Sequence, residues 1–596
     1  MSRRAKRLGL AGVGAAVVAA CGYLPMEQLP LAEDGLTAEG GIGDGATTPP
    51  GLADGGVDPT NRDASNPGDD DDDDAGDPRI DASDDDAGCR HCDALFVWES
   101  GGDDDGAGTP EAPFKTLKRA FDAVTNGGRK VTTIYVASGK YDDAVTLIDG
   151  VSMSGAWTCD AANPPCKWET QDFANKSHIA NQTNAGVVVP KEVTRATRFT
   201  GFRVVGVSGN VAADQLGSVG MTVAGSPRLV ENELYGGDLS LTAVGVNRRS
   251  IGLLVTGSND AARPGPYVED CTLAGQTADH SIGLLFETPI GGSFSGGFAN
   301  AFVTRSDIRS GPAVTSVAVV ANNTTAATVL DDNTIVAGPS SSDDASVGGS
   351  WAVDVRAPIT IDRNRIHPPG PSQGPTPQCR PAFSSFCGGV RVVGAAAVLT
   401  NNFIGGVRAP LSVALLLTDN ANLPSKVVVN GNVIDGGGNR DEGKSAAIVV
   451  KNTHRLVLSL GHVRNNILLG GVARRRYHVY EDAALQQEAH LADFAYNDLF
   501  HVPPEHPGDD FAYRTWDNGV EHLLSFDKLT EVKVPTIDVR TLYNEDPKLT
   551  ALVRMSNPNL VNAGSPNDID DPDAPDHDFE NEQRTRPIDI GADEIR

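Results

Sequence analysis

The residue types best suited to chemistry in this 596-residue chain are aspartates gathered in two loops. These are Asp103, Asp104 and Asp105, which lie between glycines, and Asp568, Asp570 and Asp573 near the C-terminus. Hard carboxylate oxygens on flexible loops are the ligands that calcium takes, although neither loop has the twelve-residue EF-hand pattern. We therefore expect that, if these loops bind a metal, the metal is calcium. The alternative is that both loops are solvated and bind no metal.

Six of the eight cysteines form pairs that are close in sequence. The pairs are Cys89 with Cys92, Cys159 with Cys166, and Cys379 with Cys387. In an exported protein, which the N-terminus indicates below, disulfides are the default, so we expect three local bridges. For the first pair, a redox CxxC is the alternative. Cys271 is left over, and we expect it to face inward as a small hydrophobe. No further CxxC has zinc spacing, so we do not expect structural zinc.

A short phrase recurs along the chain: an apolar run, a turn, and a branched residue two places after an Asn or its substitute. The Asn position is filled by Asn232, Cys271, Ser306, Asn333, Asn364, Asn402, Asn432, Asn466 and Asn497. Subtracting neighbouring numbers gives spacings of 27 to 39 residues. This is the period range of stacked repeats.

Each repeat offers two or three short β-branched strands, such as 251–255, 282–286 and 413–417. Such strands cannot bury a core alone but can do so when one coil stacks on the next. The pattern predicts an all-β fold, a right-handed parallel β-helix, in which the Asn amides form a hydrogen-bonded ladder at one corner. A β-sandwich or a propeller is the alternative, but the unequal spacings argue against propeller blades.

The first 20 residues predict a secretory signal peptide: a basic start at Arg3, Arg4, Lys6 and Arg7 precedes an apolar run too short to span a bilayer. Cys21 follows the run Val-Ala-Ala, which resembles the lipobox of bacterial lipoproteins. That resemblance implies a lipid on Cys21. Because Gly22 rather than Asp comes next, the resemblance also implies location in the outer membrane. Whether the protein faces the periplasm or the cell exterior is left open.

Residues 21–88 predict a disordered tether. Residues 22–88 contain 19 acidic and 2 basic residues, hence 2 − 19 = −17 of the total charge of −30. Self-repulsion and a lack of core-forming residues keep such a segment extended. The sequence contains no cluster of basic residues of the kind that binds nucleic acid, so we expect no nucleic-acid partner.

The folded part divides into 89–160, the N-terminal cap and first coils; 161–500, the repeats; and 501–596, an irregular C-terminal module. The phrase 108–117 (GTPEAPFKTL) and the amphipathic helix after it resemble the N-terminal cap of pectin-lyase-like β-helix proteins. The phrases 544–549, 556–566 and 586–594 resemble the ending of the bacterial β-helix family called choice-of-anchor Q.

The resemblance raises the question of catalysis, because polysaccharide lyases and glycosidases share the fold. They need carboxylates that hold calcium beside a basic residue, or carboxylates flanking a glycosidic bond. The recurring acids fall at the turn just before the Asn, where corner solvation or Asx-turn bonding explains them. They are Glu231, Glu269, Asp270, Asp331, Asp332 and Asp362. We find no carboxylate and Lys or Arg at one outward strand position in consecutive coils, so we assign no catalytic residue.

The expected function is therefore a monomeric, lipid-anchored, non-catalytic module that binds a polysaccharide or a cell-surface protein along the face bearing the insertions. Phe294, Phe298 and Phe302, in a Gly/Ser-rich insertion, are candidate ligand contacts; shielding of a coil edge is their alternative role. A polysaccharide lyase or glycosidase and a passive spacer are the competing functions.

Overall fold

The structure is a computed structural model. It describes residues 93–127, 130–159, 168, 171–180, 185–209, 217–239, 248–257, 264–287, 298–340, 349–367, 387–418, 426–438, 443–451, 461–482, 491, 493–500, 509–517, 520–530, 538, 541–545, 547, 559–560, 563–564, 577–578, 581 and 589–591. Within these ranges, no helix has the length and apolarity needed to cross a membrane.

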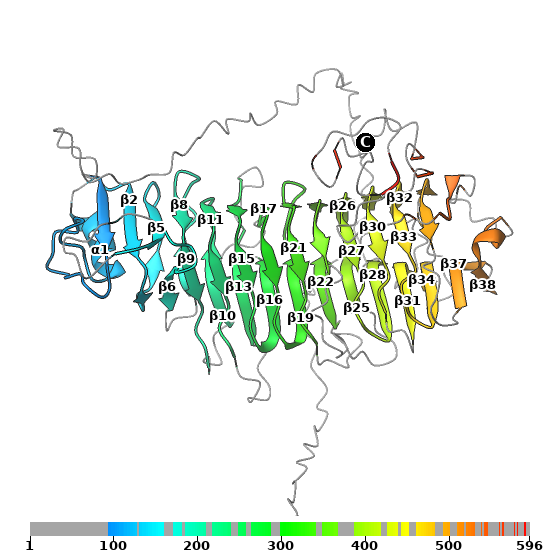
Figure 1. The fold of residues 1–596 in the computed structure, drawn as a ribbon, viewed down its shortest axis with the longest axis horizontal. Coiled ribbons are helices and arrows are strands. Elements are labelled where there is room, and N and C mark those ends of the chain that lie inside the picture. The colour runs from blue at the N-terminus through cyan, green and yellow to red at the C-terminus, as the bar shows by residue number, and fades with distance from the viewer. Residues whose placement is uncertain are drawn as a thin grey trace, which may run out of the picture. The chain divides into compact units, whose positions relative to one another are not determined.

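Three long sheets, A, B and C, run along the folded unit, and each coil contributes one strand to each sheet in turn (Figure 1). Sheet A holds β1 (Ala94–Val97), β2 (Thr133–Ala137), β5 (Ser152–Trp157), β8 (Arg198–Thr200), β11 (Arg228–Val230), β14 (Tyr267–Glu269), β17 (Phe302–Thr304), β20 (Val329–Asp331), β23 (Ile359–Asp362), β26 (Ala396–Thr400), β29 (Lys426–Asn430), β32 (His462–Arg464) and β35 (Asp493–Ala495).

Sheet B holds β3 (Lys140–Tyr141), β6 (Ser177–Ala180), β9 (Phe202–Val205), β12 (Glu233–Tyr235), β15 (Thr272–Ala274), β18 (Asp307–Arg309), β21 (Thr334–Val336), β24 (Arg365–Ile366), β27 (Phe403–Gly405), β30 (Val433–Asp435), β33 (Ile467–Leu469) and β36 (Asp498–Phe500). Sheet C holds β4 (Val145–Thr146), β7 (Ala185–Val189), β10 (Ser218–Val223), β13 (Arg249–Val255), β16 (Ala278–Phe286), β19 (Ala313–Ala321), β22 (Ser350–Val355), β25 (Cys387–Val393), β28 (Leu411–Thr418), β31 (Lys444–Lys451), β34 (Arg475–Asp482), β37 (Asp509–Asp517) and β38 (Val520–Leu524).

The pairing confirms the predicted right-handed parallel β-helix. Strands of successive coils pair in parallel, as β14 does with β17 and β17 with β20. The antiparallel pair among the named strands is β37 with β38, at the end of sheet C. Because β37 pairs in parallel with β34, sheet C continues past residue 500, where the sequence placed the end of the repeats.

The core is one continuous column of inward side chains, because alternate strand positions face inward and repeat in register. Val268, Val303 and Leu330 are stacked in this way on three successive strands of sheet A and are fully buried. A single coil would leave this column exposed, so each coil depends on its neighbours.

The predicted amide ladder is present at the bend between sheets A and B. Asn333, Asn364, Asn402, Asn432, Asn466 and Asn497 are fully buried and bonded in sequence. In each step the side-chain oxygen accepts the backbone N–H of the preceding ladder residue, as Asn402 Oδ1 does from Asn364 N at 2.9 Å. Cys271 occupies the same row as a buried free thiol, which confirms its predicted inward position.

Helix α1 (Leu117–Asn126) packs against the first coil and buries Leu117 and Ala120 in the core. Asp104 fixes its start, because Asp104 Oδ1 accepts the backbone N–H groups of Lys115 at 3.0 Å and Thr116 at 2.9 Å. Thr116 then caps the helix through Oγ1, which accepts Arg119 N.

Described pieces of the C-terminal module lie on the outer surface of sheet B and the neighbouring bend. Leu560 and Ile590 are fully buried in an apolar cluster with Phe403, Val433 and Ile467. Gly591 N donates to Asn465 O at 2.8 Å. The module therefore covers apolar side chains that the last coils turn outward, and Figure 1 draws these pieces in red. A short 3₁₀ helix (Phe526–Lys528) follows β38.

Candidate functional site

One residue in most coils has a left-handed backbone at the bend between sheets A and B. These residues are Glu231, Asp270, Arg305, Asp332, Arg363, Asn401, Asn465 and Tyr496, with φ between 47° and 57°. Few non-glycine residues adopt this region, and Asn and Asp are the ones that tolerate it best. Each bend residue immediately precedes a ladder residue, so the buried ladder fixes a row of polar side chains along the stack.

The outer surface of sheet A begins with an aromatic stack. Arg228, Tyr267 and Phe302 pair in register on β11, β14 and β17. The rings of Tyr267 and Phe302 are parallel, with centroids 5.5 Å apart, and the Arg228 guanidinium lies 5.5 Å from the Tyr267 ring centroid. Both rings are half-buried and Arg228 is exposed. Phe298, at the approach to β17, is 41% exposed.

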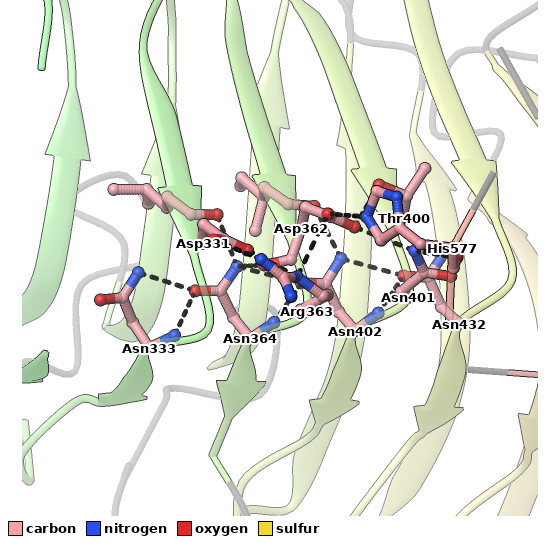
Figure 2. Close-up of polar contacts among 12 residues, drawn as sticks. Asp331, Asn333, Asp362, Arg363, Asn364, Thr400, Asn401, Asn402, Asn432 and His577 are labelled. Atoms are coloured by element: carbon pink, nitrogen blue, oxygen red, sulfur yellow. Dashed lines mark hydrogen bonds and ion pairs between the residues drawn. The ribbon is translucent and has the colours of Figure 1, made fainter. Parts of the chain in front are cut away.

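Further along the same surface, two carboxylates meet on adjacent coils. Asp331 and Asp362 pair in register at the ends of β20 and β23, strands whose backbones lie about 4.8 Å apart. Arg363 Nε and Nη2 donate to Asp331 Oδ1 and Oδ2 at 2.8 and 2.5 Å. Arg363 Nε also lies 3.7 Å from Asp362 Oδ2, so one guanidinium lies between two carboxylates (Figure 2).

Asp362 is held from its other side by the next coil and by the C-terminal module. Thr400 Oγ1 and Asn401 Nδ2 donate to Asp362 Oδ1 at 2.7 and 3.1 Å. His577 Nε2 lies 2.7 Å from Asp362 Oδ2, and the His577 carbonyl accepts Asn401 Nδ2 at 3.0 Å. Figure 2 shows these side chains converging beside the amide ladder. The cluster joins residues separated by more than 200 positions in the chain.

Burial affects the titration of one carboxyl group in the cluster. Burial raises the pKa of Asp331, and this effect outweighs the opposing influence of Arg363. A carboxyl with a raised pKa beside a second carboxyl is an arrangement that acid–base chemistry uses. The same contacts also tie the C-terminal module to the stack, so the cluster has a structural role as well.

These contacts correct one interpretation made from the sequence. Asp331 and Asp362 lie at one outward strand position in consecutive coils, and Arg363, which pairs with both, is a bend residue outside that position. They are buried ion-pair partners rather than solvated corner residues. Glu269 and Asp270 likewise both pair with Arg305, across one coil step.

Two of the aspartates proposed for calcium, Asp103 and Asp104, accept hydrogen bonds from the protein backbone. Asp104 Oδ1 accepts the N–H of Thr116 at 2.9 Å, and Asp103 Oδ1 accepts the N–H of Asp105 at 3.1 Å. The part of the chain that the structure describes contains no group of three or more His, Cys, Asp or Glu arranged to hold a metal ion. Asp568, Asp570 and Asp573 lie outside the described residues, and calcium stays a prediction.

Several other predicted residues also lie outside the described part. They are Cys21, Cys89, Cys92, Cys166, Phe294 and Cys379, together with the signal peptide and the tether. Cys159 and Cys387 are each in disulfide-bonded form, but the described residues do not include a bonded partner for either, so both pairings stay predictions. Of the three phenylalanines, Phe302 forms part of the aromatic stack and Phe298 is exposed.

The sequence reading missed Arg228, Tyr267, Arg363 and His577. A signal for the cluster existed: Asp331 and Asp362 each stand two places before a ladder Asn, and that equal offset predicts register on neighbouring strands.

No protein-family model and no curated protein matches this chain. Among solved structures, the chain is similar to pectate lyase Pel9A, with 12% identity, 84% of this chain and 97% of that chain covered, and a TM-score of 0.32. It is similar to the tailspike protein gp49 of Acinetobacter baumannii bacteriophage Fri1, a capsular polysaccharide depolymerase, with 11% identity, 72% and 65% coverage and a TM-score of 0.32. XylC in complex with xylose has 10% identity, 84% and 98% coverage and a TM-score of 0.33. Sequence identities and TM-scores this low give no information about function. The pairing of the strands establishes the fold.

Proposed function

We propose that this protein is a lipid-anchored β-helix of the cell envelope that binds an extended polysaccharide along the outer surface of sheet A without cleaving it. One observation carries the proposal: solvent-reachable aromatic and charged side chains repeat in register on that surface, from Arg228 through Tyr267 and Phe302. Repetition at about 4.8 Å suits a ligand that is itself a repeating chain.

The chemistry of the surface suits sugars. Aromatic side chains offer apolar contact area together with a polar tip, as in Tyr267, and arginine offers several hydrogen-bond donors to hydroxyl or acidic groups. Phe298, four residues before Phe302 in the chain, adds an exposed ring. We also propose that the chain is related to the choice-of-anchor Q proteins, which its C-terminal phrases resemble. A cell-surface protein is the alternative ligand.

Anchoring is proposed at Cys21, with residues 22–88 as the spacer between the bilayer and the stack. More than one acyl chain on a single residue gives a stable anchor, whereas a single chain gives a weak one. Fractionation of a Cys21→Ser variant tests this, because it should leave the membrane fraction. Retention of the variant in that fraction would refute the anchor.

The binding experiment incubates the purified folded part with a panel of polysaccharides, with and without calcium, and measures both retention and new reducing or unsaturated ends. We expect retention of at least one polymer without products. The double variant Tyr267→Ala/Phe302→Ala should lose retention, whereas Val520→Ala, an exposed position on β38, should not. Retention that is equal in all three proteins would refute the assignment of this surface.

A second candidate function, polysaccharide cleavage, is favoured by the Asp331 and Asp362 pair. Retaining glycosidases use two carboxyl groups about 5–5.5 Å apart, and adjacent coils place their strands at about 4.8 Å. Product formation by the native protein, lost in both Asp331→Asn and Asp362→Asn while retention persists, would establish cleavage in place of simple binding. Products lost on calcium removal would instead point to a lyase.

A further inference from the structure

A pocket opens at the first bends of the stack, at the N-terminal end of the row of bend residues. Its walls include Trp98 after β1, Ser138 after β2, Trp157 at the end of β5, and Asn175 and Lys176 before β6, and it encloses about 430 Å³. This volume lies within the range of small-molecule sites, which is about 300–1,000 Å³. None of the residues discussed above for polysaccharide binding lines it.

The pocket has a fixed aromatic wall. The Trp98 ring packs against Gly101, where an added Cβ would approach ring carbons to 2.2 Å, so glycine at this position leaves room for the ring. Trp157 stands behind it, nearly fully buried, with Nε1 donating to Ser154 Oγ at 3.0 Å and its ring edge-on to Tyr135. A half-buried indole held in this way offers a rigid apolar surface to the ring of a small ligand.

Lys176 is the charged side chain among the described residues that line the pocket. Lys176 Nζ donates to Glu231 O at 2.8 Å and lies 3.9 Å from Glu233 Oε1, a long ion pair. An ammonium group has three donors, so these contacts leave capacity for a ligand. The walls of the pocket include no carboxylate side chain among the described residues. Asn175 is exposed at the rim, where its Nδ2 donates to Asp172 Oδ2 at 2.6 Å.

Position links the pocket to the surface of sheet A. Lys176 bonds to Glu231, the first residue of the bend row, which directly follows β11. In sheet A, Tyr267 on β14 lies four strands beyond β2, or about 19 Å along the stack. A ligand unit in the pocket therefore lies at one end of the aromatic and charged surface.

We propose that this pocket binds the terminal sugar of the polysaccharide and selects a sugar that carries an anionic group. The inference rests on the proposed function, because it identifies which end group that surface accepts. The sugar ring lies against Trp98, and its anionic group accepts hydrogen bonds from Lys176.

The test titrates the folded part with glucuronate, glucose and acetate and follows binding by calorimetry. Glucuronate should bind saturably, and glucose and acetate should bind at least tenfold more weakly, because each lacks one half of the recognised group. Trp98→Ala should abolish glucuronate binding. Lys176→Gln should weaken it at least tenfold, and Lys176→Arg should restore most of it. The matched control Lys191→Gln, an exposed lysine paired with Glu192, should bind like the native protein.

Circular dichroism establishes that each variant is folded. Equal binding of glucuronate by native, Trp98→Ala and Lys176→Gln proteins would overturn the pocket, as would equal binding of glucose and glucuronate. If a polymer is retained through Tyr267 and Phe302 but glucuronate does not bind, the end pocket alone is wrong. If neither polymer nor glucuronate binds, both the end pocket and the proposed function are wrong.

Discussion

Replacing Asn402 by alanine removes one step of the amide ladder from the middle of the stack. Asn402 is fully buried and makes four side-chain hydrogen bonds. Its Nδ2 donates to Ile361 O at 2.8 Å and Asn432 Oδ1 at 3.0 Å, and its Oδ1 accepts from Asn364 N at 2.9 Å and Asn364 Nδ2 at 3.1 Å. The change leaves the buried Asn364 N–H without its acceptor.

An orphaned buried donor costs about 1–3 kcal/mol, and each of the three further lost bonds costs about 0.5–1.5 kcal/mol, so the coil should lose at least about 2.5 kcal/mol. That is a rise in local opening of roughly 60-fold or more. Since a solenoid loses stability locally, the suitable assay is native-state hydrogen exchange read by mass spectrometry over residues 359–435.

Two variants provide controls. Asn402→Ser should lose less, because Ser306 already serves in this row and its Oγ accepts Cys271 N at 3.2 Å. Asn126→Ala, at the exposed end of α1, should leave these coils unchanged. Protection of residues 359–435 that is equal in native and Asn402→Ala proteins would refute the account of the ladder.

Three further changes have definite outcomes. Burial lowers the pKa of His367 to about 4, so the unfolded chain binds the proton more readily than the folded chain does. Denaturation midpoints should therefore fall as the pH drops from about 6.5 to 4. The pH dependence should be weaker in His367→Asn, and an unchanged dependence would contradict this role of His367. Cys271→Asn should add an amide to the row next to Asn232 and slow hydrogen exchange in β11–β15; faster exchange would mean that the site cannot hold an amide. His577→Ala should expose the C-terminal module to limited proteolysis sooner than His577→Gln does, whereas identical cleavage rates would show that the contact with Asp362 does not hold it.

The fold could be predicted because its determinants are local. Each ladder residue is followed by a branched residue two places later, and the buried bonds of Asn333 and Asn364 turn that short phrase directly into the stacking of coils. Cys271 could be placed inward by the same alignment.

The cluster around Asp362 depends on information that the repeat phrase does not contain. Arg363 has a left-handed backbone, which its residue type does not favour, and the ladder imposes it. His577 contacts Asp362 only because the chain returns along the stack after the last coil, and no local sequence pattern predicts which coil His577 contacts. The half-buried stack of Tyr267 on Phe302 likewise follows from pairing across a long insertion.

The central claim is that an extended polysaccharide lies on the outer surface of sheet A, and hydroxyl-radical footprinting tests it most directly. With a polymer identified in the retention assay, the account predicts reduced oxidation of Tyr267, Phe298 and Phe302 on binding, and unchanged oxidation of Val520 and Leu523 on β38. Protection at β38, or unchanged oxidation of the three aromatic residues while the polymer is bound, would contradict it.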